Sequence, residues 1–555
     1  MDPKSAFNGK LEEIRRAAEE RAAQRQAEKF NLPYLDLSKS PVDVEALGLL
    51  DEEVAKKAQA AIIASKRKTL ILATINPDTP EIANIVKDFE AKGYEIKINI
   101  CSLSSLKHIF DAYKFVVKPA AEITGRVQIE TGRLEELTKK LVTLPILKEE
   151  IINFKSPYTS QIFELVLAGA LANRASDIHL EESKEAGRFR LRIDGVLHDV
   201  IDNLNPDTYQ SLISRIKLLS GLKLNVHDQA QDGRFTIIAG QKDIEIRTSI
   251  LPSEYGETAV LRVLDPSAIH LKLEDLGMRP DDLKIIDVEI NKPHGLILNT
   301  GPTGSGKTTT LYAFLNRVYS PEIKIITVED PIEYHLAGIA QTQVDPESGY
   351  TFASGLRSIL RQDPDVILVG EIRDAETAGI AIQAALTGHI VFSTLHTNEA
   401  AGAIPRLIDL GAKSAILGSA LTLIMAQRLV RKLCEHCKVP MEIDEKIKEK
   451  INLFVDRLPE RVDNKSGLKN FKIFKAAGCE KCGNIGYKGR MAIVELLLVT
   501  PDMEEIISKN PTQRDIQEIA KKQGMVKLQE DGLIKVLSSL TSLEEVESVT
   551  GPIEW

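Results

Sequence analysis

A glycine-rich turn after a short apolar run carries the residues best suited to bind a phosphate chain. The run GLILNT ends in a turn that fits the pattern G-x-x-x-x-G-K-S/T. Its members are Gly301, Pro302, Thr303, Gly304, Ser305, Gly306, Lys307 and Thr308, followed by Thr309. Glycines let backbone N–H groups point inward, and a following helix adds partial positive charge. We therefore expect ATP at this turn, with Lys307 on the β- and γ-phosphates and the Thr308 hydroxyl on Mg²⁺.

Acidic side chains and one histidine follow three later apolar runs. The run DVILVGE ends in Glu371, which we expect to act as the general base on the attacking water. Glu329, Asp330 and Glu333 follow the run IKIITV and are expected near Mg²⁺. His396 follows the run HIVFSTL and could sense the γ-phosphate, although a histidine at a strand end is more often structural.

Four of the five cysteines form two Cys-x-x-Cys pairs, Cys434 with Cys437 and Cys479 with Cys482. Two such pairs suit tetrahedral Zn²⁺, because each turn offers two thiolates. Four thiolates leave no open coordination position, so we expect a structural zinc site. Redox chemistry and an iron–sulfur cluster are the alternatives. The fifth cysteine, Cys101, ends an alternating apolar run and is expected to be a small buried residue.

The elements that must position these groups divide the chain into five predicted parts. From 271 onward, short runs that are apolar on both faces alternate with helical segments, which indicates a parallel sheet covered by helices. Earlier segments alternate apolar and polar residues, as in half-buried strands. The expected parts are a helical leader (1–30), an α+β docking domain (31–136), a second α+β domain (137–270), an α/β ATPase domain (271–499) with a zinc subdomain (431–490), and a helical segment (500–555).

Three expectations concern the first parts of the chain. The segment Lys10–Phe30 is expected to be an exposed helix, either a solvated leader or a docking helix. A further helix is expected around Glu52–Ile63. The charged stretch Thr131–Lys155 is expected to separate the first α+β unit from the second.

Composition limits the class of protein. The chain has 555 residues, 43% hydrophobic and 27% charged, with a formal net charge of -9, as in a soluble multidomain protein. The acidic balance disfavours nucleic acid as the main partner. We see no run of roughly 18–20 uncharged apolar residues that could cross a bilayer. The N-terminal residues lack the apolar core of a signal peptide, so we expect a cytoplasmic protein.

Three segments in a fixed order resemble one protein family. ITVEDPIEY resembles the Asp box of the secretion ATPase superfamily, LRSILRQDPDVILVGEIRDAETA its Walker B region, and TGHIVFSTLHTNEA its His box. From about Ser156 onward, the chain is similar to the type II secretion and type IV pilus assembly ATPases. This resemblance implies a homohexamer in which a RecA-like ATPase domain follows a PAS-like domain, with ATP between the two.

The resemblance also implies arginines that close on the phosphates from the preceding domain. The matching residues are Arg234 in QDGRF and Arg247 in IEIRTSI, with Arg190 and Arg192 in FRLRIDG as secondary candidates. A mobile cation would make phosphoryl transfer depend on domain closure. For each of these arginines an ordinary salt bridge is the alternative, and Arg262 could equally be structural.

In the same family, members that assemble fibres carry the four-cysteine insertion. Residues 31–115 resemble the second half of the N-terminal domain of the assembly ATPases. We do not find the Leu- and Gly-patterned segment that binds cyclic di-GMP in some relatives, so we expect docking to a protein partner instead.

Together these features predict an ATP-hydrolysing motor for type IV pilus assembly at the cytoplasmic face of the inner membrane. The expected partners are an integral inner-membrane platform protein and a cytoplasmic or membrane-anchored docking protein, and no nucleic acid. A type II secretion ATPase is the main alternative. A DNA translocase is disfavoured by the acidic charge. A scaffold that binds ATP without hydrolysing it is disfavoured because Lys307, Thr308 and Glu371 are all present.

Overall fold

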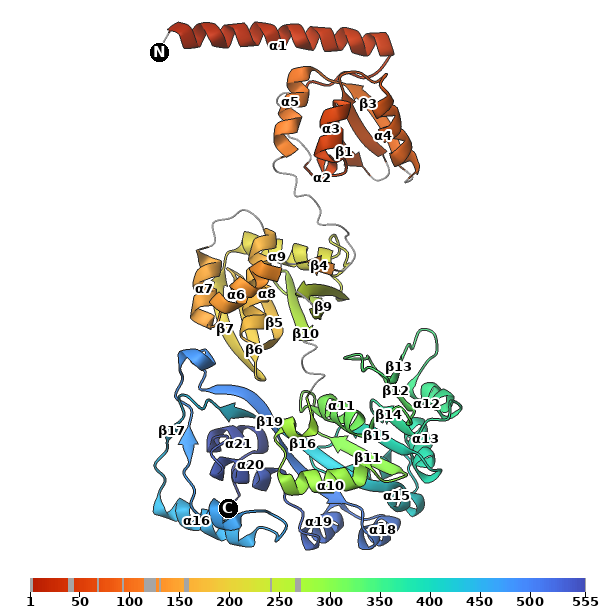
Figure 1. The fold of residues 1–555 in the computed structure, drawn as a ribbon, viewed down its shortest axis with the longest axis vertical. Helices are drawn as coiled ribbons and strands as arrows, with labels where there is room; N and C mark the ends of the chain where they lie inside the picture. Colours follow the sequence, from red (N-terminus) through yellow and green to blue (C-terminus); the bar gives the residue numbers. More distant parts are fainter. Residues whose placement is uncertain are drawn as a thin grey trace. The chain divides into compact units, whose positions relative to one another are not determined.

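The chain is described by a computed structural model over residues 3–37, 44–66, 69–91, 94–113, 126–128, 131–153, 159–239, 242–264 and 271–554. Its contacts divide it into two units, Met1–Ile123 and Thr124–Trp555. Figure 1 shows the elements of both units. Within the described ranges, no helix is sufficiently long and apolar to cross a membrane.

The first unit combines a long helix with a small α+β domain. Strands β1 (Ala60–Lys66), β2 (Thr69–Thr74) and β3 (Glu95–Ile100) form a sheet in that order, with β1 antiparallel to β2 and β3 parallel to it. Cys101 is fully buried in its core, as predicted. The helices are α1 (Pro3–Phe30), α2 (Val44–Leu47), α3 (Glu52–Ala58), α4 (Pro80–Ala91) and α5 (Leu103–Ala112).

The second half of α1 packs on this domain. Ala23 and Ala27 are buried against Ile100, and the Ser102 hydroxyl donates a hydrogen bond of 2.7 Å to Glu20. Of the two interpretations of this segment, the structure therefore favours a helix that docks, at least onto its own domain.

The prediction of a helix over Glu52–Ile63 is wrong beyond Ala58. Gln59 adopts a left-handed conformation (φ 46°), and its N–H bonds to carbonyls of the last helical turn. Ala60 then begins β1, whose Ile62 pairs with Leu72 of β2. Strand pairing overrides the high helix propensity of this alanine-rich segment, because pairing buries Ile62 in the core.

A seven-stranded sheet, called the middle sheet, forms the first part of the second unit. Its order is β4-β8-β9-β10-β5-β6-β7, and every neighbouring pair is antiparallel except β4 with β8. The strands are β4 (Arg126–Gln128), β5 (Ala175–Glu182), β6 (Gly187–Ile193), β7 (Val196–Leu204), β8 (Gln231–Ala239), β9 (Lys242–Pro252) and β10 (Glu257–Leu264). The alternation predicted for FRLRIDGVLHDV is confirmed in β6, where every second residue is buried, but not in β7, whose first four residues are all exposed or half-buried. The predicted alternation is also present in β9.

One face of the middle sheet packs against α6 (Thr131–Lys140), α7 (Leu144–Ile152), α8 (Thr159–Ala172) and α9 (Pro206–Leu219). The charged stretch expected to be a separator therefore includes two helices of this domain, because Leu134 and Leu147 enter its core. A domain boundary at 136 stays a prediction, and it would divide α6. Residues 154–158 and 265–270, where other expected boundaries fall, lie outside the described ranges.

A second seven-stranded sheet, called the C-terminal sheet, has the order β13-β12-β14-β15-β11-β16-β19. Its strands are parallel except for β16 with β19. They are β11 (Gly295–Thr300), β12 (Ile325–Glu329), β13 (Ala340–Gln343), β14 (Val366–Val369), β15 (Ile390–Leu395), β16 (Leu421–Leu433) and β19 (Tyr487–Leu498). The four runs predicted as parallel strands are β11, β12, β14 and β15, which confirms that prediction.

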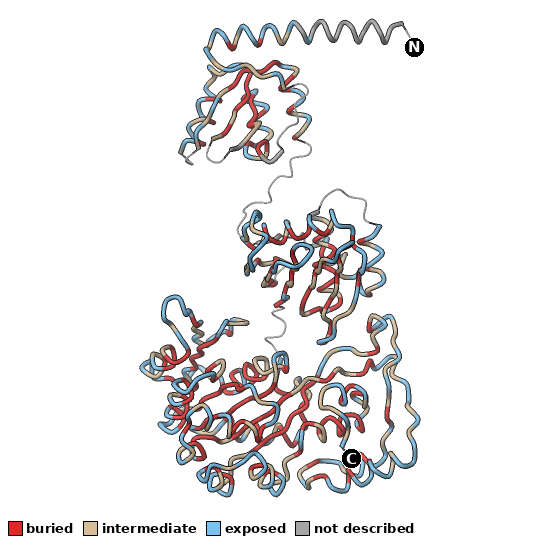
Figure 2. Tube along the Cα trace, turned by 180° about the vertical axis from the view of Figure 1, so that it is seen from behind, coloured by how far each residue is buried: buried red, intermediate tan, exposed pale blue. Residues whose placement is uncertain are grey.

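Helices cover both faces of the C-terminal sheet, and Figure 2 shows its strands as a buried layer. Leu296 and Leu298 of β11 face one apolar core, whereas Ile297 between them faces the other. The helices are α10 (Pro280–Ile290), α11 (Lys307–Val318), α12 (Phe352–Leu360), α13 (Ala375–Leu386), α14 (Ala403–Asp409) and α15 (Ser414–Ala420), after the 3-10 turn η3 (Leu273–Leu276).

Between β16 and β19 the chain forms a subdomain that contains the cysteines, and after β19 it is helical, as predicted. The subdomain holds β17 (Val439–Pro440), α16 (Glu445–Arg457), α17 (Lys465–Leu468), β18 (Phe474–Lys475) and η4 (Glu480–Cys482). The last helices are α18 (Pro501–Ser508), α19 (Gln513–Lys522), α20 (Leu528–Leu537) and α21 (Leu543–Thr550).

Candidate nucleotide and metal sites

The predicted phosphate loop joins β11 to α11 and folds as a strand–turn–helix. Gly301, Gly304 and Gly306 have φ of 147°, 80° and 86°, a region that favours glycine. A Cβ on Gly301 would lie 2.5 Å from the Gln427 carbonyl oxygen, and one on Gly306 would lie 2.9 Å from the Gln427 amide nitrogen. The loop therefore needs glycine both for its backbone conformation and for its close approach to β16.

Lys307 begins α11 and turns back over the loop. Its ammonium group donates hydrogen bonds to the carbonyl oxygens of Gly301 (2.8 Å) and Pro302 (3.0 Å). Burial lowers the pKa of Lys307, against the opposing attraction of Glu371. The ammonium group thus lies where a phosphate could replace its bonds to neutral carbonyls with stronger charge-assisted bonds.

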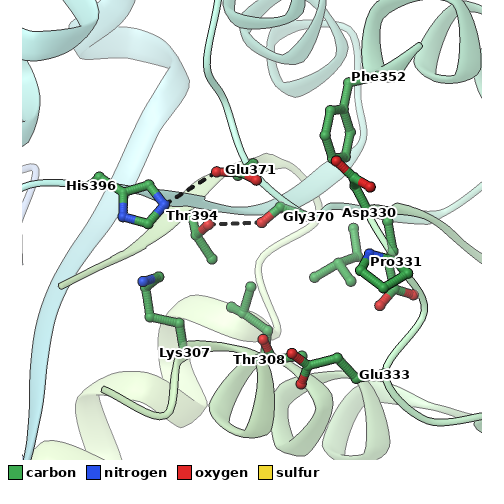
Figure 3. A pocket seen from close by; sticks show the side chains of 13 residues that line it. Lys307, Thr308, Asp330, Pro331, Glu333, Phe352, Gly370, Glu371, Thr394 and His396 are labelled. Atoms are coloured by element: carbon green, nitrogen blue, oxygen red, sulfur yellow. Dashed lines mark hydrogen bonds and ion pairs between the residues drawn. The ribbon is translucent and has the colours of Figure 1, made fainter. Parts of the chain in front are cut away.

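A cavity of about 170 Å³ opens above α11. Lys307 and Thr308 line one side of it, and Glu371 and His396 line the opposite side (Figure 3). The buried hydroxyl of Ser305 has no hydrogen-bond partner among the described residues. A loop with a free donor, an ammonium group and a facing carboxylate has the chemistry that a nucleotide with Mg²⁺ requires.

Glu371 and His396 meet because they follow two strands that pair side by side, β14 and β15. His396 Nε2 lies 3.2 Å from Glu371 Oε2. Arg373 forms an ion pair with the other oxygen of Glu371 and lies 3.8 Å from Asp330. The hydrogen bond to Glu371 raises the pKa of the Arg373 guanidinium. The base candidate therefore lies between one permanent cation and one imidazole.

The expected Asp-box carboxylates differ in their surroundings. Glu329, at the end of β12, is buried and accepts hydrogen bonds from Tyr312, Thr327 and Gln341. Its role as a direct Mg²⁺ ligand stays a prediction, and the observed bonds anchor β12 to α11 and β13.

Asp330 and Glu333 lie beyond β12 and line the cavity (Figure 3). Burial raises the pKa of Glu333, while the charge of Arg247 opposes the rise.

The two expected arginines lie opposite each other on neighbouring strands, Arg234 on β8 and Arg247 on β9. The Arg247 guanidinium donates a 2.6 Å hydrogen bond to the Ile332 carbonyl, within the segment that follows β12. Arg234 is exposed and does not line the cavity. The structure thus places Arg247 against the segment that borders the cavity, although neither arginine lines the cavity itself.

The secondary arginine candidates have partners within the middle sheet. Arg190 pairs with Glu181, whereas Arg192 and Arg262 lie 3.5 Å and 3.2 Å from Asp177. These pairs agree with the salt-bridge alternative that the sequence left open for each of them.

Gln427 and Arg373 support the site and were not predicted. Gln427, buried in β16, accepts hydrogen bonds from Asn299 of β11 (3.0 Å) and Thr310 of α11 (2.9 Å). It therefore holds both ends of the phosphate loop against β16. Its signal was a polar side chain inside the apolar run LTLIMAQRLV. Arg373 stands two residues after Glu371, and its charge beside the expected base was the available signal.

The four cysteines of the two pairs converge, as predicted. Their sulfur atoms all lie within 4.8 Å of one another, and three of the Sγ–Sγ distances are 3.8–3.9 Å. Tetrahedral zinc with Zn–S bonds of about 2.3 Å requires Sγ–Sγ distances of about 3.8 Å. These three distances match that spacing, and the four-cysteine cluster is compatible with Zn²⁺.

The backbone around the second cysteine pair favours thiolate. Both Cys479 and Gly486 donate backbone N–H groups to the Cys482 sulfur at 3.2 Å. Burial alone would disfavour the charged form, but these donors, together with the neighbouring thiols of Cys479 and Cys437, lower the pKa of Cys482 to about 7. A thiol that ionises near neutral pH is suited to bind a metal.

Fold and site together define a phosphate-loop protein with an appended four-cysteine subdomain. Residues 155–548 match the family described as "Type II/IV secretion system protein", and residues 30–114 match the MshEN domain. The chain belongs to the type II/IV secretion system protein family.

Two curated relatives differ in how much of the chain they match. The type IV pilus assembly ATPase PilB of Thermus thermophilus is 36% identical over 95% of this chain, which spans 57% of that relative. The type II secretion system protein E of Dickeya dadantii is 45% identical over 70% of this chain and 75% of its own length.

Among solved structures, the ATPase DotB of Legionella pneumophila covers 71% of this chain and 96% of its own chain, with a TM-score of 0.51 and 21% identity. This likeness supports the predicted RecA-like α/β fold. The PAS-like description of the middle domain stays a prediction.

Proposed function

We propose that this chain is an ATP-hydrolysing motor that powers type IV pilus assembly. The observation that carries the proposal is the convergence of Lys307, Thr308, Glu371 and His396 on one cavity from three separate segments. Family membership supports ATP hydrolysis. The pilus relative matches 95% of this chain and the secretion relative 70%, and this wider match favours the pilus over type II secretion.

In this proposal the residues of the cavity divide the chemical work. Lys307 and the loop N–H groups hold the phosphates, and Glu371 takes a proton from the water that attacks the γ-phosphorus. His396, hydrogen-bonded to Glu371, then reports whether the γ-phosphate is present. Mg²⁺, when bound by Thr308, would neutralise charge on the phosphate oxygens.

Arg247 supplies the link between domains. It lies on β9 of the middle sheet, and its guanidinium bonds to the segment that follows β12 of the C-terminal sheet. A movement of the middle domain, proposed as PAS-like and spanning 137–270, would therefore bring its charge to the phosphates or remove it. Arg234, its neighbour across the sheet, would join it or serve an adjacent copy in the proposed hexamer.

The four-cysteine cluster is proposed to hold a structural Zn²⁺. Two backbone donors to one sulfur and the matched Sγ–Sγ spacing support this role. The proposed partners are an integral inner-membrane platform protein, which the hexamer would drive, and a docking protein for the N-terminal unit. We place the motor at the cytoplasmic face of the inner membrane.

The proposal is tested in the native cell by replacing the chromosomal copy with Glu371→Gln. The matched control is Glu376→Gln, five residues further on and exposed on α13. Loss of surface fibres with an unchanged set of secreted proteins, in the Glu371 variant alone, is the expected result. Loss of exported proteins with intact fibres would instead assign the chain to type II secretion. No change in either would contradict the motor.

A further inference from the structure

A buried carboxylate lies where the C-terminal sheet meets the last helices, and the chemistry proposed above does not use it. Glu495 of β19 is 5% exposed and pairs in register with Ala426 of β16. Its Oε1 accepts the backbone N–H of Ala400 at 2.6 Å, and its Oε2 accepts that of Leu528 at 3.2 Å. One side chain therefore joins two segments that are distant in sequence. Each bond is charge-assisted and shielded from water, which makes it strong.

The first of these segments is the loop that follows His396. Ala400 lies four residues after His396, between β15 and α14. The preceding residue, Glu399, accepts hydrogen bonds from the side chains of Gln513 (3.1 Å) and Gln517 (2.8 Å) on α19. The loop is therefore held at two consecutive residues. Glu399 bonds to α19, and Ala400 bonds to the buried Glu495 of β19.

The second segment is the first turn of α20, which begins at Leu528. A carboxylate at this end of a helix is favoured by the partial positive charge of its N–H groups. The same helix is fixed to β19 by Asp531, which accepts the Val494 N–H at 2.8 Å, and by Lys535, which donates to the Ala492 carbonyl oxygen. α20 and β19 therefore behave as one body, and Glu495 connects that body to the loop.

Burial is costly for this group, so its contacts must compensate. Burial raises the pKa of Glu495, and the two backbone donors oppose the rise. No described cation forms an ion pair with Glu495 within 4.0 Å. A buried carboxylate that depends on two backbone N–H groups would resist separation of either one.

We propose that Glu495 is a positioning residue for ATP hydrolysis, because it holds the loop after His396 against the first turn of α20. A displacement of His396 on binding or loss of the γ-phosphate then moves the C-terminal helices with it. This inference rests on the proposed function, since it requires a nucleotide at the phosphate loop. It adds a route by which the C-terminal helices respond to the state of that nucleotide.

The test compares the full-length chain with Glu495→Gln, in which an N–H₂ group must face one of the two backbone donors. Glu505→Gln, on the exposed surface of α18, is the control for loss of a carboxylate. We expect Glu495→Gln to lower kcat by about tenfold while KM for ATP changes by less than about twofold. The control should leave both constants unchanged.

Hydrogen exchange separates coupling from a loss of structure. In the parent chain, a non-hydrolysable ATP analogue with Mg²⁺ should slow exchange in 301–308 and change it in 528–537. In Glu495→Gln the first effect should persist and the second should disappear. Glu495→Asp, which keeps the charge but is one methylene shorter, should lose the second effect as well, and it provides the same test if the Gln variant does not fold.

The outcomes distinguish the inference from the function on which it rests. If 301–308 is protected in both chains and 528–537 responds equally in both, the coupling role of Glu495 is wrong while nucleotide binding stands. If the analogue protects 301–308 in neither chain, the proposed function fails and the inference fails with it. A fall in kcat/KM that comes only from KM would also overturn the positioning role.

Discussion

The two seven-stranded sheets of the second unit carry their polar groups in different ways. In the C-terminal sheet, every residue of β11 and of β15 is buried, so the polar groups of the cavity are confined to strand ends. In the middle sheet, β6 alternates buried and half-buried residues, and the face away from the helices carries arginines along its length.

This difference separates residues that are held by the C-terminal sheet from an arginine that a movement of the middle domain can displace. Glu371 and His396 follow the paired strands β14 and β15, so a movement of the middle domain leaves the two strand ends side by side. Arg247 stands on a different sheet, so its distance from the cavity can change by a movement of the whole domain. Strand ends in parallel sheets commonly bind ligands for the first reason, and mobile arginines act by the second.

The largest effect is expected from Lys307→Ala, at the phosphate loop that follows β11 of the C-terminal sheet. This variant should lower kcat/KM for ATP by about 1,000-fold, because the phosphates lose their only cation within the loop. The control is Lys284→Ala, which removes an exposed lysine from α10. Steady-state hydrolysis and direct nucleotide binding measure both. Binding and turnover that match the parent would contradict the assignment of the loop.

Arg247→Gln tests the arginine that a movement of the middle domain would displace. We expect kcat to fall by about 100-fold with a smaller change in nucleotide affinity, because the cation is needed when charge develops on the phosphoryl group. Arg188→Gln is matched, since Arg188 lies on the same middle sheet but pairs with Asp199 of the neighbouring strand. Equal losses of kcat in both variants would mean that either substitution merely destabilises the middle sheet. That result would contradict a specific role for Arg247.

A smaller effect is expected from Arg373→Gln. The variant removes the permanent cation that pairs with Glu371 and lies near Asp330. Because the Glu371 carboxylate would then be oriented by His396 alone, kcat should fall by about tenfold. The measurement is the rate of ATP hydrolysis at saturating nucleotide. A rate equal to that of the parent would show that His396 suffices to orient the base.

The smallest effect on hydrolysis is expected at the cysteine cluster. Cys437→Ser should abolish stoichiometric zinc, measured by elemental analysis, and lower the Tm by about 5 °C. KM for ATP should stay within about twofold of the parent value, because no cysteine lines the cavity. An unchanged zinc content in this variant would exclude the four-sulfur site.

The sequence predicts the C-terminal sheet well because apolar runs buried on both faces leave little ambiguity. β11, β12, β14 and β15 all coincide with such runs, and the motifs at their ends therefore meet. The helix predicted for Glu52–Ile63 is confirmed only as far as Ala58. Beyond it the prediction was wrong because Ala and Ile are compatible with either structure in a short segment, and only pairing with β2 decides.

Contacts between distant segments are what the sequence could not predict. Gln427 supports the phosphate loop from a strand 128 positions away from Asn299, and Glu495 meets Ala400 across 95 positions. Neither residue belongs to a motif with fixed spacing, and each is a buried polar residue within a mostly apolar stretch of its strand. Their partners are defined only when β16 and β19 join the sheet.

The most direct test of the account is ATP hydrolysis by the purified chain and by Glu371→Gln, with Mg²⁺ and at saturating nucleotide. The account predicts that the parent hydrolyses ATP, whereas the variant binds the nucleotide with similar affinity and turns over at least about 100-fold more slowly. Hydrolysis by Glu371→Gln at the rate of the parent would contradict the assignment of the base.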